Sequence, residues 1–135
     1  MVLLKNENIP FDKNISIGSM IEVPSALLTV DQILSVSDFI SIGTNDLNQY
    51  LTASDREILS VADYLDFGKT ILLSYIQRSI ESANKLNQEC TICGELAGDP
   101  DYIKNLIRIG LTHFSVSPRQ IPYVKNMIYS YPRNA

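Results

Sequence analysis

The sequence predicts an α/β fold in which helices cover a parallel sheet. The order strand, loop, helix occurs four times along the chain, and this alternation is typical of parallel sheets. The candidate functional residues Glu22, Asp46 and Cys93 each follow a predicted strand, which is where ligands bind in such folds. The chain has 135 residues, whereas a closed (β/α)₈ barrel needs roughly 250. We therefore expect about four β/α units, or half of such a barrel.

The first unit carries a candidate carboxylate. Residues 15–21 alternate as a strand does, and Glu22 then falls at the carboxyl end of the strand, on the face opposite its isoleucines. Those isoleucines are Ile15, Ile17 and Ile21. A helix is predicted from Pro24 to about Ser35, since proline is favoured in a first helical turn.

The second unit places polar groups after a buried strand. The strand is predicted from Asp38 to Gly43, followed by a loop with Asn45 and Asp46 and a short helix from Asp46 to Thr52. Carboxylate and amide oxygens suit Mg²⁺, which prefers oxygen ligands. Asn and Asp are also good helix caps, so a capping role stays open for this pair.

The third unit begins with a polar excursion from Arg56 to Phe67, either a lid or a connection. The planar guanidinium of Arg56 could bind a phosphate or carboxylate bidentately. Gly68 to Asn87 is the clearest predicted helix. Its apolar stripe, which predicts core packing, consists of Leu72, Ile76, Ile80, Ala83 and Leu86.

The last strands and helices complete the pattern. A strand is predicted from Glu89 to Ile92, with Cys93 and a turn at residues 94–98 before a helix from about Asp99 to Ile109. The final predicted unit is a strand from His113 to Val116 and a helix from Pro118 to about Ser130.

Two cysteines, Cys90 and Cys93, form a C-T-I-C sequence. On a strand, residues three apart point to opposite faces and lie roughly 10 Å apart, which exceeds the Cα separation of about 7 Å that a disulfide allows. Zinc would need further ligands, and the chain has one histidine, His113. We expect neither a disulfide nor a zinc site.

Composition limits the possible partners. The net charge is −4, without a basic run, so nucleic acid is not an expected partner. No apolar run approaches the roughly 18 residues of a membrane span, and the start lacks a signal-peptide core. We therefore expect a soluble, cytoplasmic protein with no membrane contact. From its length we expect residues 1–135 to form a single partial domain.

Five motifs stand in order at Met20 to Ala26, Asp38 to Tyr50, Ser54 to Arg56, Cys93 to Asp99 and Phe114 to Ser117. Taken together, in this order and at this spacing, they closely resemble the C-terminal barrel of phosphoenolpyruvate-utilising enzymes. The motif C-G-E-L-A-G-D is similar to the corresponding motif of phosphoenolpyruvate–protein phosphotransferase, enzyme I of the bacterial phosphotransferase system. The motif V-P-S-A-L is similar to that of its nitrogen-related branch. The resemblance implies the last four strands of a (β/α)₈ TIM barrel.

The resemblance also implies a site. It makes Glu22 and Asp46 ligands of Mg²⁺, lets Asn45 and Arg56 contact the phosphate of phosphoenolpyruvate, and makes Cys93 the proton donor to enolpyruvate. Its implied partners are phosphoenolpyruvate and pyruvate, and a histidine-phosphorylated carrier protein reached through the full enzyme. In that enzyme the phosphoryl group passes to a histidine on a domain that this sequence lacks.

The missing half of the barrel leads to further expectations. The chain would be a cut fragment, a split-gene product or a remnant, inactive by itself, and would self-associate or pair with the missing half. The sequence departs from the family at Asn48, where Thr is usual, and at Phe67-Gly68-Lys69, where Leu-His-Pro is usual. The alternatives are a non-catalytic half-barrel interaction module, or part of an enzyme like pyruvate phosphate dikinase or phosphoenolpyruvate synthase.

Overall fold

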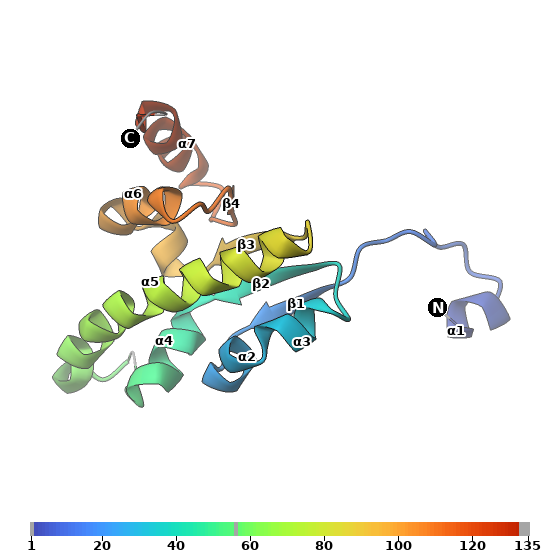
Figure 1. The fold of residues 1–135 in the computed structure, drawn as a ribbon, viewed down its shortest axis with the longest axis horizontal. Coiled ribbons are helices and arrows are strands. Elements are labelled where there is room, and N and C mark those ends of the chain that lie inside the picture. Colours follow the sequence, from blue (N-terminus) through green and yellow to red (C-terminus); the bar gives the residue numbers. More distant parts are fainter. Residues whose placement is uncertain (1, 56, 133–135) are drawn as a thin grey trace.

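A four-stranded parallel sheet is the centre of the fold (Figure 1). The computed structural model describes residues 2–55 and 57–132. The strands lie side by side in chain order: β1 (Gly18–Ile21), β2 (Phe39–Gly43), β3 (Glu89–Cys93) and β4 (His113–Phe114). All neighbouring pairs are parallel. The predicted α/β class with about four parallel units is therefore confirmed, and the arrangement is consistent with part of an α/β barrel.

Helices connect the strands as the alternation predicted. The α-helices are α1 (Val2–Asn6), α2 (Pro24–Leu28), α3 (Val30–Leu34), α4 (Thr44–Thr52), α5 (Ala62–Lys85), α6 (Pro100–Arg108) and α7 (Ile121–Ser130). Two short 3₁₀ helices are η1 (Leu59–Val61) and η2 (Glu95–Gly98). Within residues 2–55 and 57–132, no helix is both long enough and apolar enough to cross a membrane.

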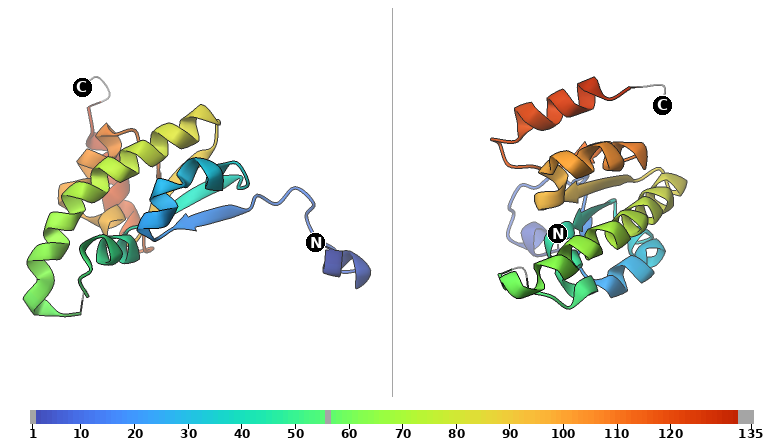
Figure 2. Two further views of the ribbon diagram at one scale, coloured as in Figure 1. Left: turned by 60° about the horizontal axis from the view of Figure 1, so that its bottom comes forward. Right: turned by 90° about the vertical axis from the view of Figure 1, so that its left-hand side faces the viewer.

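The core lies between the sheet and the helices. Ile40 and Ile42 of β2 are fully buried, whereas Phe39 and Ser41, which alternate with them, are half-buried. Two views show α2, α3 and α5 on the same side of the central strands (Figures 1 and 2). The face that carries Ser41 therefore has none of these helices against it, as expected for the inner face of an incomplete barrel.

The first strand is shorter than predicted. Ile15 and Ile17 are 60% and 61% exposed and precede β1, so the predicted start of this strand at residue 15 is wrong. The physical reason lies in Asp38, whose carboxylate accepts the backbone N–H of Ile17 at 2.7 Å. The pairing of strand residues with β2 begins one residue later, at Gly18.

Helix limits also differ from the predictions. The helix predicted from Pro24 to Ser35 is divided at Thr29, whose hydroxyl donates to the carbonyl of Ser25 at 2.9 Å. Helix α5 begins at Ala62, which shortens the predicted excursion, and α1 was not predicted. Helix α7 begins at Ile121 rather than at Pro118.

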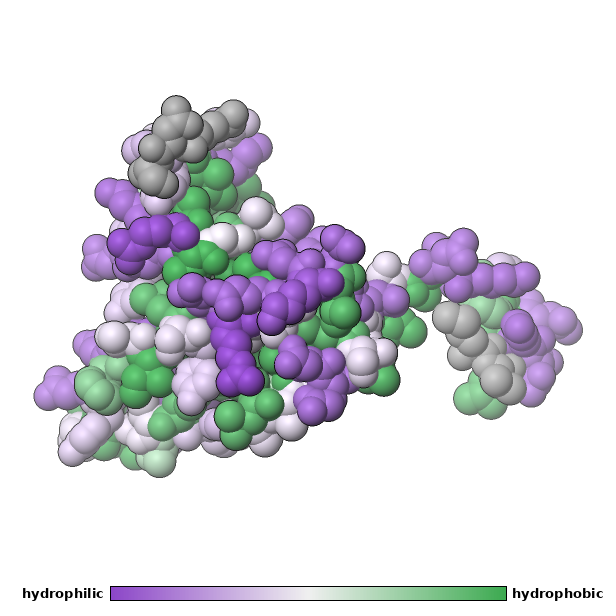
Figure 3. Space-filling view, viewed as in Figure 1, coloured by the Kyte–Doolittle hydropathy of each residue, from purple (hydrophilic) through white to green (hydrophobic). Residues whose placement is uncertain are grey.

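The amphipathic pattern of α5 is confirmed with one exception. Leu72, Ile76, Ile80 and Ala83 are buried, but Leu86 follows the end of the helix and is 50% exposed. The outward side of α5 carries exposed Gln77, Arg78, Glu81 and Lys85. Figure 3 shows hydrophilic side chains gathered over the middle of this face of the molecule.

Candidate active site

The predicted site residues of the described chain lie at one edge of the sheet. Because the strands are parallel, their carboxyl ends share this edge. Glu22 directly follows β1, Asn45 and Asp46 follow Thr44 after the end of β2, and Cys93 is the last residue of β3. The register pairs Ile21 with Ile42 and Gly43 with Cys93, so the ends of all three strands stand at nearly the same level.

Glu22 lies over Gly43 because glycine has no side chain there. An added Cβ at Gly43 would stand 2.6 Å from Glu22 Oε1 and 2.7 Å from its Cγ. The backbone of Gly43 is extended, at φ −84°, so a left-handed conformation is not what requires this glycine. Its role is to leave space for the carboxylate beside the end of β2.

Asn45 and Asp46 lie in the first turn of α4 rather than in a loop. The helix begins at Thr44, and its N-cap is Gly43 without a side-chain hydrogen bond. Neither Asn45 nor Asp46 therefore caps this helix, which was the alternative role that the sequence left open. Asp46 is exposed, and a carboxylate in a first turn is stabilised by the helix dipole.

The amide of Asn45 has a fixed orientation. Its Oδ1 accepts the backbone N–H of Glu95 at 2.9 Å. Because this bond uses only Oδ1, the two N–H groups of Nδ2 can donate to an anion. The hydroxyl of Thr44 donates to the carbonyl of Cys93 at 2.9 Å. Together these bonds connect the first turn of α4 to the loop after β3.

The Cys93 thiol lies on the face of the sheet that carries Ser41. Its Sγ is 3.6 Å from the Ser41 hydroxyl and donates weakly to the carbonyl of Ile42 at 3.5 Å. Cys93 is half-buried, and both cysteines are free, as the sequence predicted. Cys90 points into the core, and burial, with a smaller effect of Glu89, raises the pKa of its thiol to about 12.

A cavity of about 430 Å³ opens beside Asn45 and Cys93. Asn45 and Cys93 form one wall together with Gly94 and Glu95, and the segment after β4 forms the other. The lining residues of that segment are Ser115, Val116, Ser117 and Gln120. Gly94 has φ +99°, a conformation that favours glycine, and an added Cβ would stand 2.5 Å from the Thr44 hydroxyl.

The two carboxylates are suitable for Mg²⁺. Mg²⁺ in proteins usually keeps one or two carboxylates and completes its octahedron with water or substrate phosphate. Within the described chain, neither Glu22 nor Asp46 accepts a side-chain hydrogen bond or forms a salt bridge. No group of three or more His, Cys, Asp or Glu residues in residues 2–55 and 57–132 is arranged to hold a metal. Glu22 and Asp46 are two carboxylates, the number that Mg²⁺ often keeps beside water or substrate phosphate.

One predicted site residue, Arg56, lies outside the described residues. The structure adds three residues that sequence reasoning missed: Ser41 beside the thiol, Thr44 at the turn, and Gly43 beneath Glu22. Ser41 could have been predicted to lie near Cys93 from strand alternation. Residues 41 and 43 lie on the same face of β2, and Gly43 pairs with Cys93 of β3.

Comparison with known proteins identifies the family. The family described as "PEP-utilising enzyme, PEP-binding domain" matches residues 2–132. This chain belongs to that family of PEP-utilising enzymes. The match confirms the resemblance that the motifs indicated, and it covers both the strands and the polar residues at their carboxyl ends.

Curated relatives of this PEP-binding domain are longer proteins. "Phosphoenolpyruvate-protein phosphotransferase" of Buchnera aphidicola subsp. Acyrthosiphon pisum is 41% identical over 127 residues, covering 94% of this chain and 22% of the relative. The protein of that name from Cupriavidus necator is 41% identical over 118 residues, covering 87% and 20%. "Multiphosphoryl transfer protein 2" of Escherichia coli K12 is 36% identical over 122 residues, covering 90% and 15%. The chain thus spans about a fifth of the length of the phosphotransferases that it matches.

Proposed function

We propose that this chain is the half of a phosphoenolpyruvate–protein phosphotransferase barrel that binds Mg²⁺ and phosphoenolpyruvate. One observation supports the proposal: Glu22, Asn45, Asp46 and Cys93 lie at or just after the carboxyl ends of three different strands, at one edge of the sheet. The chain's family and the names of its relatives support the same substrate.

Each residue has a role that its surroundings allow. Glu22 and Asp46 would hold Mg²⁺, since their oxygens are not engaged within the described chain. Asn45 would donate from Nδ2 to the phosphate, because its Oδ1 is held by Glu95. Arg56 would add a fixed positive charge near the phosphate. When bound, Mg²⁺ would neutralise negative charge on the phosphate and the enolate.

The reaction needs two bond changes at the substrate. The bond between the enol oxygen and phosphorus breaks as a histidine nitrogen, on another domain of the full enzyme, bonds to phosphorus. The Cys93 S–H then breaks as its proton forms a C–H bond at the methylene carbon, which yields pyruvate. The resulting thiolate regains a proton from solvent. The 3.6 Å contact with Ser41 is a route by which a hydroxyl could support that thiolate.

The open edges of the sheet support pairing with another part of a barrel. The outer edges of β1 and β4 are the two open edges of the sheet, and open edges favour pairing with another chain. Met20, Ile121 and Ile128 are 48%, 45% and 41% exposed, and a cavity of about 420 Å³ beside β4 and α7 has Ile121 and Ile128 in its lining. We propose that the missing half barrel, or failing that a second copy, covers these surfaces.

Calorimetric titration tests the proposed binding. Phosphoenolpyruvate is titrated into the purified chain with and without Mg²⁺, alone and mixed with a chain that carries the missing half barrel. We expect Mg²⁺-dependent binding that Glu22→Gln and Asp46→Asn each weaken at least about tenfold, since a hydrogen bond or ligand contact of a charged group contributes about 1.5–3 kcal/mol. Glu81→Gln, which neutralises an exposed carboxylate on α5, serves as control. No binding under any of these conditions would favour the non-catalytic module.

Activity and assembly are tested separately. The chain alone should produce no pyruvate from phosphoenolpyruvate, because the phosphoryl-accepting histidine belongs to another domain. Light scattering should detect an assembly larger than one chain at tens of micromolar, an order-of-magnitude choice for weak association. A stable monomer that also does not bind a chain carrying the missing half barrel would contradict the proposed pairing.

A further inference from the structure

A second cavity, of about 250 Å³, lies between α4, α5 and η2. It shares the lining residues Asn45 and Glu95 with the cavity of the candidate active site. Part of its wall is apolar and consists of Leu65, Leu72 and Leu96. Its volume is below the roughly 300–1,000 Å³ of pockets that hold drug-sized ligands. The cavity therefore suits a ligand with a short apolar body.

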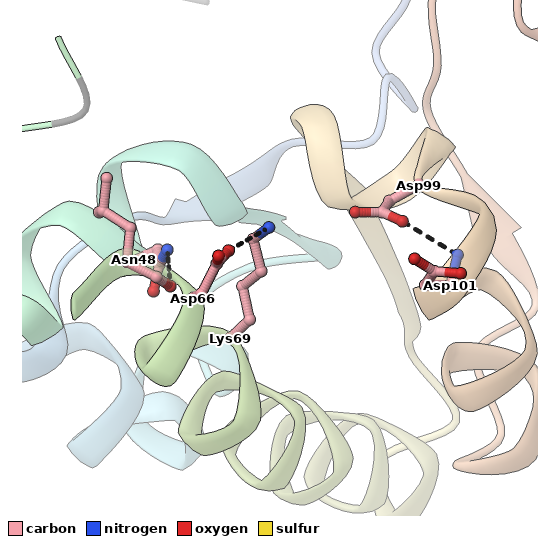
Figure 4. A network of polar contacts seen from close by, with 6 residues as sticks. Asn48, Asp66, Lys69, Asp99 and Asp101 are labelled. Atoms are coloured by element: carbon pink, nitrogen blue, oxygen red, sulfur yellow. Dashed lines mark hydrogen bonds and ion pairs between the residues drawn. The ribbon is translucent and has the colours of Figure 1, made fainter. Parts of the chain in front are cut away.

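The charged part of the lining is mainly acidic. Asp66, Glu95 and Asp99 carry carboxylates, and Lys69 is the one basic residue among the described residues of the lining. Lys69 is already paired, because its Nζ lies 2.9 Å from Asp66 Oδ1. Figure 4 shows this pair on α5, with Asp99 across from it. Once Lys69 and Asp66 neutralise each other, two carboxylates of the cavity remain without a counter-charge from its described lining.

The two remaining carboxylates have oxygens to spare. Asp99 uses Oδ1 to accept the backbone N–H of Asp101 at 3.0 Å, which caps α6. The carboxylate of Glu95 is exposed, and in the described part of the chain it takes part in no hydrogen bond or ion pair. Both side chains can therefore accept hydrogen bonds from a ligand that brings N–H donors.

Asn48 gives an independent indication that a donor is lacking. It lines the cavity and is 8% exposed. Its Nδ2 donates to the carbonyl of Leu65 at 2.9 Å, but among the described residues its Oδ1 is buried without a hydrogen-bond partner. A buried acceptor without a donor is destabilising. A ligand that supplies an N–H group at this wall would remove that cost.

We propose that this cavity binds a small aliphatic amine in its protonated form. The ammonium group would donate to the carboxylates of Glu95 and Asp99, and the alkyl body would pack on Leu65, Leu72 and Leu96. The acidic lining disfavours an anion. A metal ion is also disfavoured, because no group of three or more His, Cys, Asp or Glu residues within 2–55 and 57–132 is arranged to hold one.

The cavity is connected to the candidate active site by one hydrogen bond. Asn45 Oδ1 accepts the backbone N–H of Glu95 at 2.9 Å, and both residues line both cavities. A bound ammonium ion adds a positive charge beside Asn45, which favours a phosphate there. We therefore expect the amine to strengthen binding of phosphoenolpyruvate. This coupling rests on the proposed function, whereas the binding of the amine does not.

An NMR titration tests the binding, with 1,4-diaminobutane as the probe at constant ionic strength. The expected Kd is on the order of 1 mM, because partly exposed ion pairs contribute little. The amide signals that shift should belong to residues 44–48, 65–72 and 95–99. The control ligand is 1,4-butanediol, which has the same carbon chain and hydroxyl donors but no charge. Equal shifts with the diol, or shifts spread over acidic residues of the whole surface, would overturn the proposal.

Matched variants test the assigned residues. Ala62→Leu extends a lining side chain without changing charge and should weaken binding at least tenfold. Glu95→Gln and Asp99→Asn should each weaken it about two- to fivefold, and asparagine still caps α6. Asp101→Asn makes the same charge change outside the lining and should leave the Kd unchanged. Equal effects of Asp99→Asn and Asp101→Asn would contradict the site, and Glu95→Gln, at an exposed residue, provides the same test if another variant fails to fold.

The coupling is measured in the Mg²⁺-dependent titration of phosphoenolpyruvate. Saturating 1,4-diaminobutane should lower the Kd for phosphoenolpyruvate about fivefold, the lower end of usual allosteric effects, and Glu95→Gln should reduce this change. An unchanged Kd in the presence of the amine would overturn the coupling. If the chain binds no phosphoenolpyruvate, the proposed function fails, while the NMR titration still decides whether the cavity binds the amine.

Discussion

Gly43→Ala should displace the Glu22 side chain while leaving its carboxylate group chemically unchanged. The added methyl carbon would stand 2.6 Å from Glu22 Oε1, so the carboxylate must move by about 0.8 Å to reach an ordinary contact of 3.4 Å. The extended backbone of Gly43 accepts alanine. The free energy of unfolding should therefore change by no more than about 1 kcal/mol, the usual size of a compatible Gly to Ala change.

Metal-dependent binding should be affected much more. Mg²⁺ requires oxygen ligands at about 2.0–2.1 Å in nearly ideal octahedral geometry, so a displaced carboxylate loses most of its contact. That loss, about 1.5–3 kcal/mol for a charged group, corresponds to a roughly 10- to 100-fold weaker Kd for phosphoenolpyruvate with Mg²⁺.

The assay is calorimetric titration of wild type, Gly43→Ala, Glu22→Gln and the double variant, with thermal unfolding of each in parallel. In the Glu22→Gln background the alanine should add little, because the carboxylate contact is already lost. A Gly43→Ala chain that unfolds normally and binds as tightly as wild type would refute the placement of Glu22 in the site.

Other changes have equally specific outcomes. Thr44→Val removes the hydrogen bond to the Cys93 carbonyl and should lower the free energy of unfolding by about 1 kcal/mol in urea denaturation. At pH 8, a thiol reagent should modify half-buried Cys93 and leave Cys90 unmodified until the chain unfolds; equal rates would contradict the assigned burial. Burial raises the pKa of Cys90 from 9.0 to about 12, so the unfolded chain loses this proton first and stability should fall as pH rises through that interval, less so in Cys90→Ala. Asp99→Ala removes the side chain that caps α6 at Asp101 and should cost about 1 kcal/mol, whereas no change would argue against the cap.

The sequence predicted the sheet and the edge at which the site residues meet. Alternation placed Glu22 on the face opposite Ile21, and the order of units placed Asp46 and Cys93 at the same edge. These predictions depend on local periodicity and on parallel strand order, both of which can be read from one sequence. The roles of these residues remain predictions.

Contacts between distant side chains could not be predicted in the same way. The backbone N–H of Ile17 donates to the carboxylate of Asp38, 21 positions along the chain, and the need for Gly68 results from Asn48 on another helix. Helix α5 starts before Gly68 because packing on α4 outweighs the low helical propensity of one glycine. Such effects depend on tertiary geometry that residue spacing does not contain.

Paramagnetic relaxation tests the central claim most directly, because it locates the metal. Mn²⁺ accepts the same oxygen ligands as Mg²⁺, so adding it with phosphoenolpyruvate should broaden the amide NMR signals of Glu22, Gly43, Asp46 and Cys93 together. Asp46→Asn should weaken this broadening. Broadening centred elsewhere, for example around Asp66 and Asp99, or broadening that Asp46→Asn leaves unchanged, would contradict a shared metal and substrate site at the carboxyl ends of the strands.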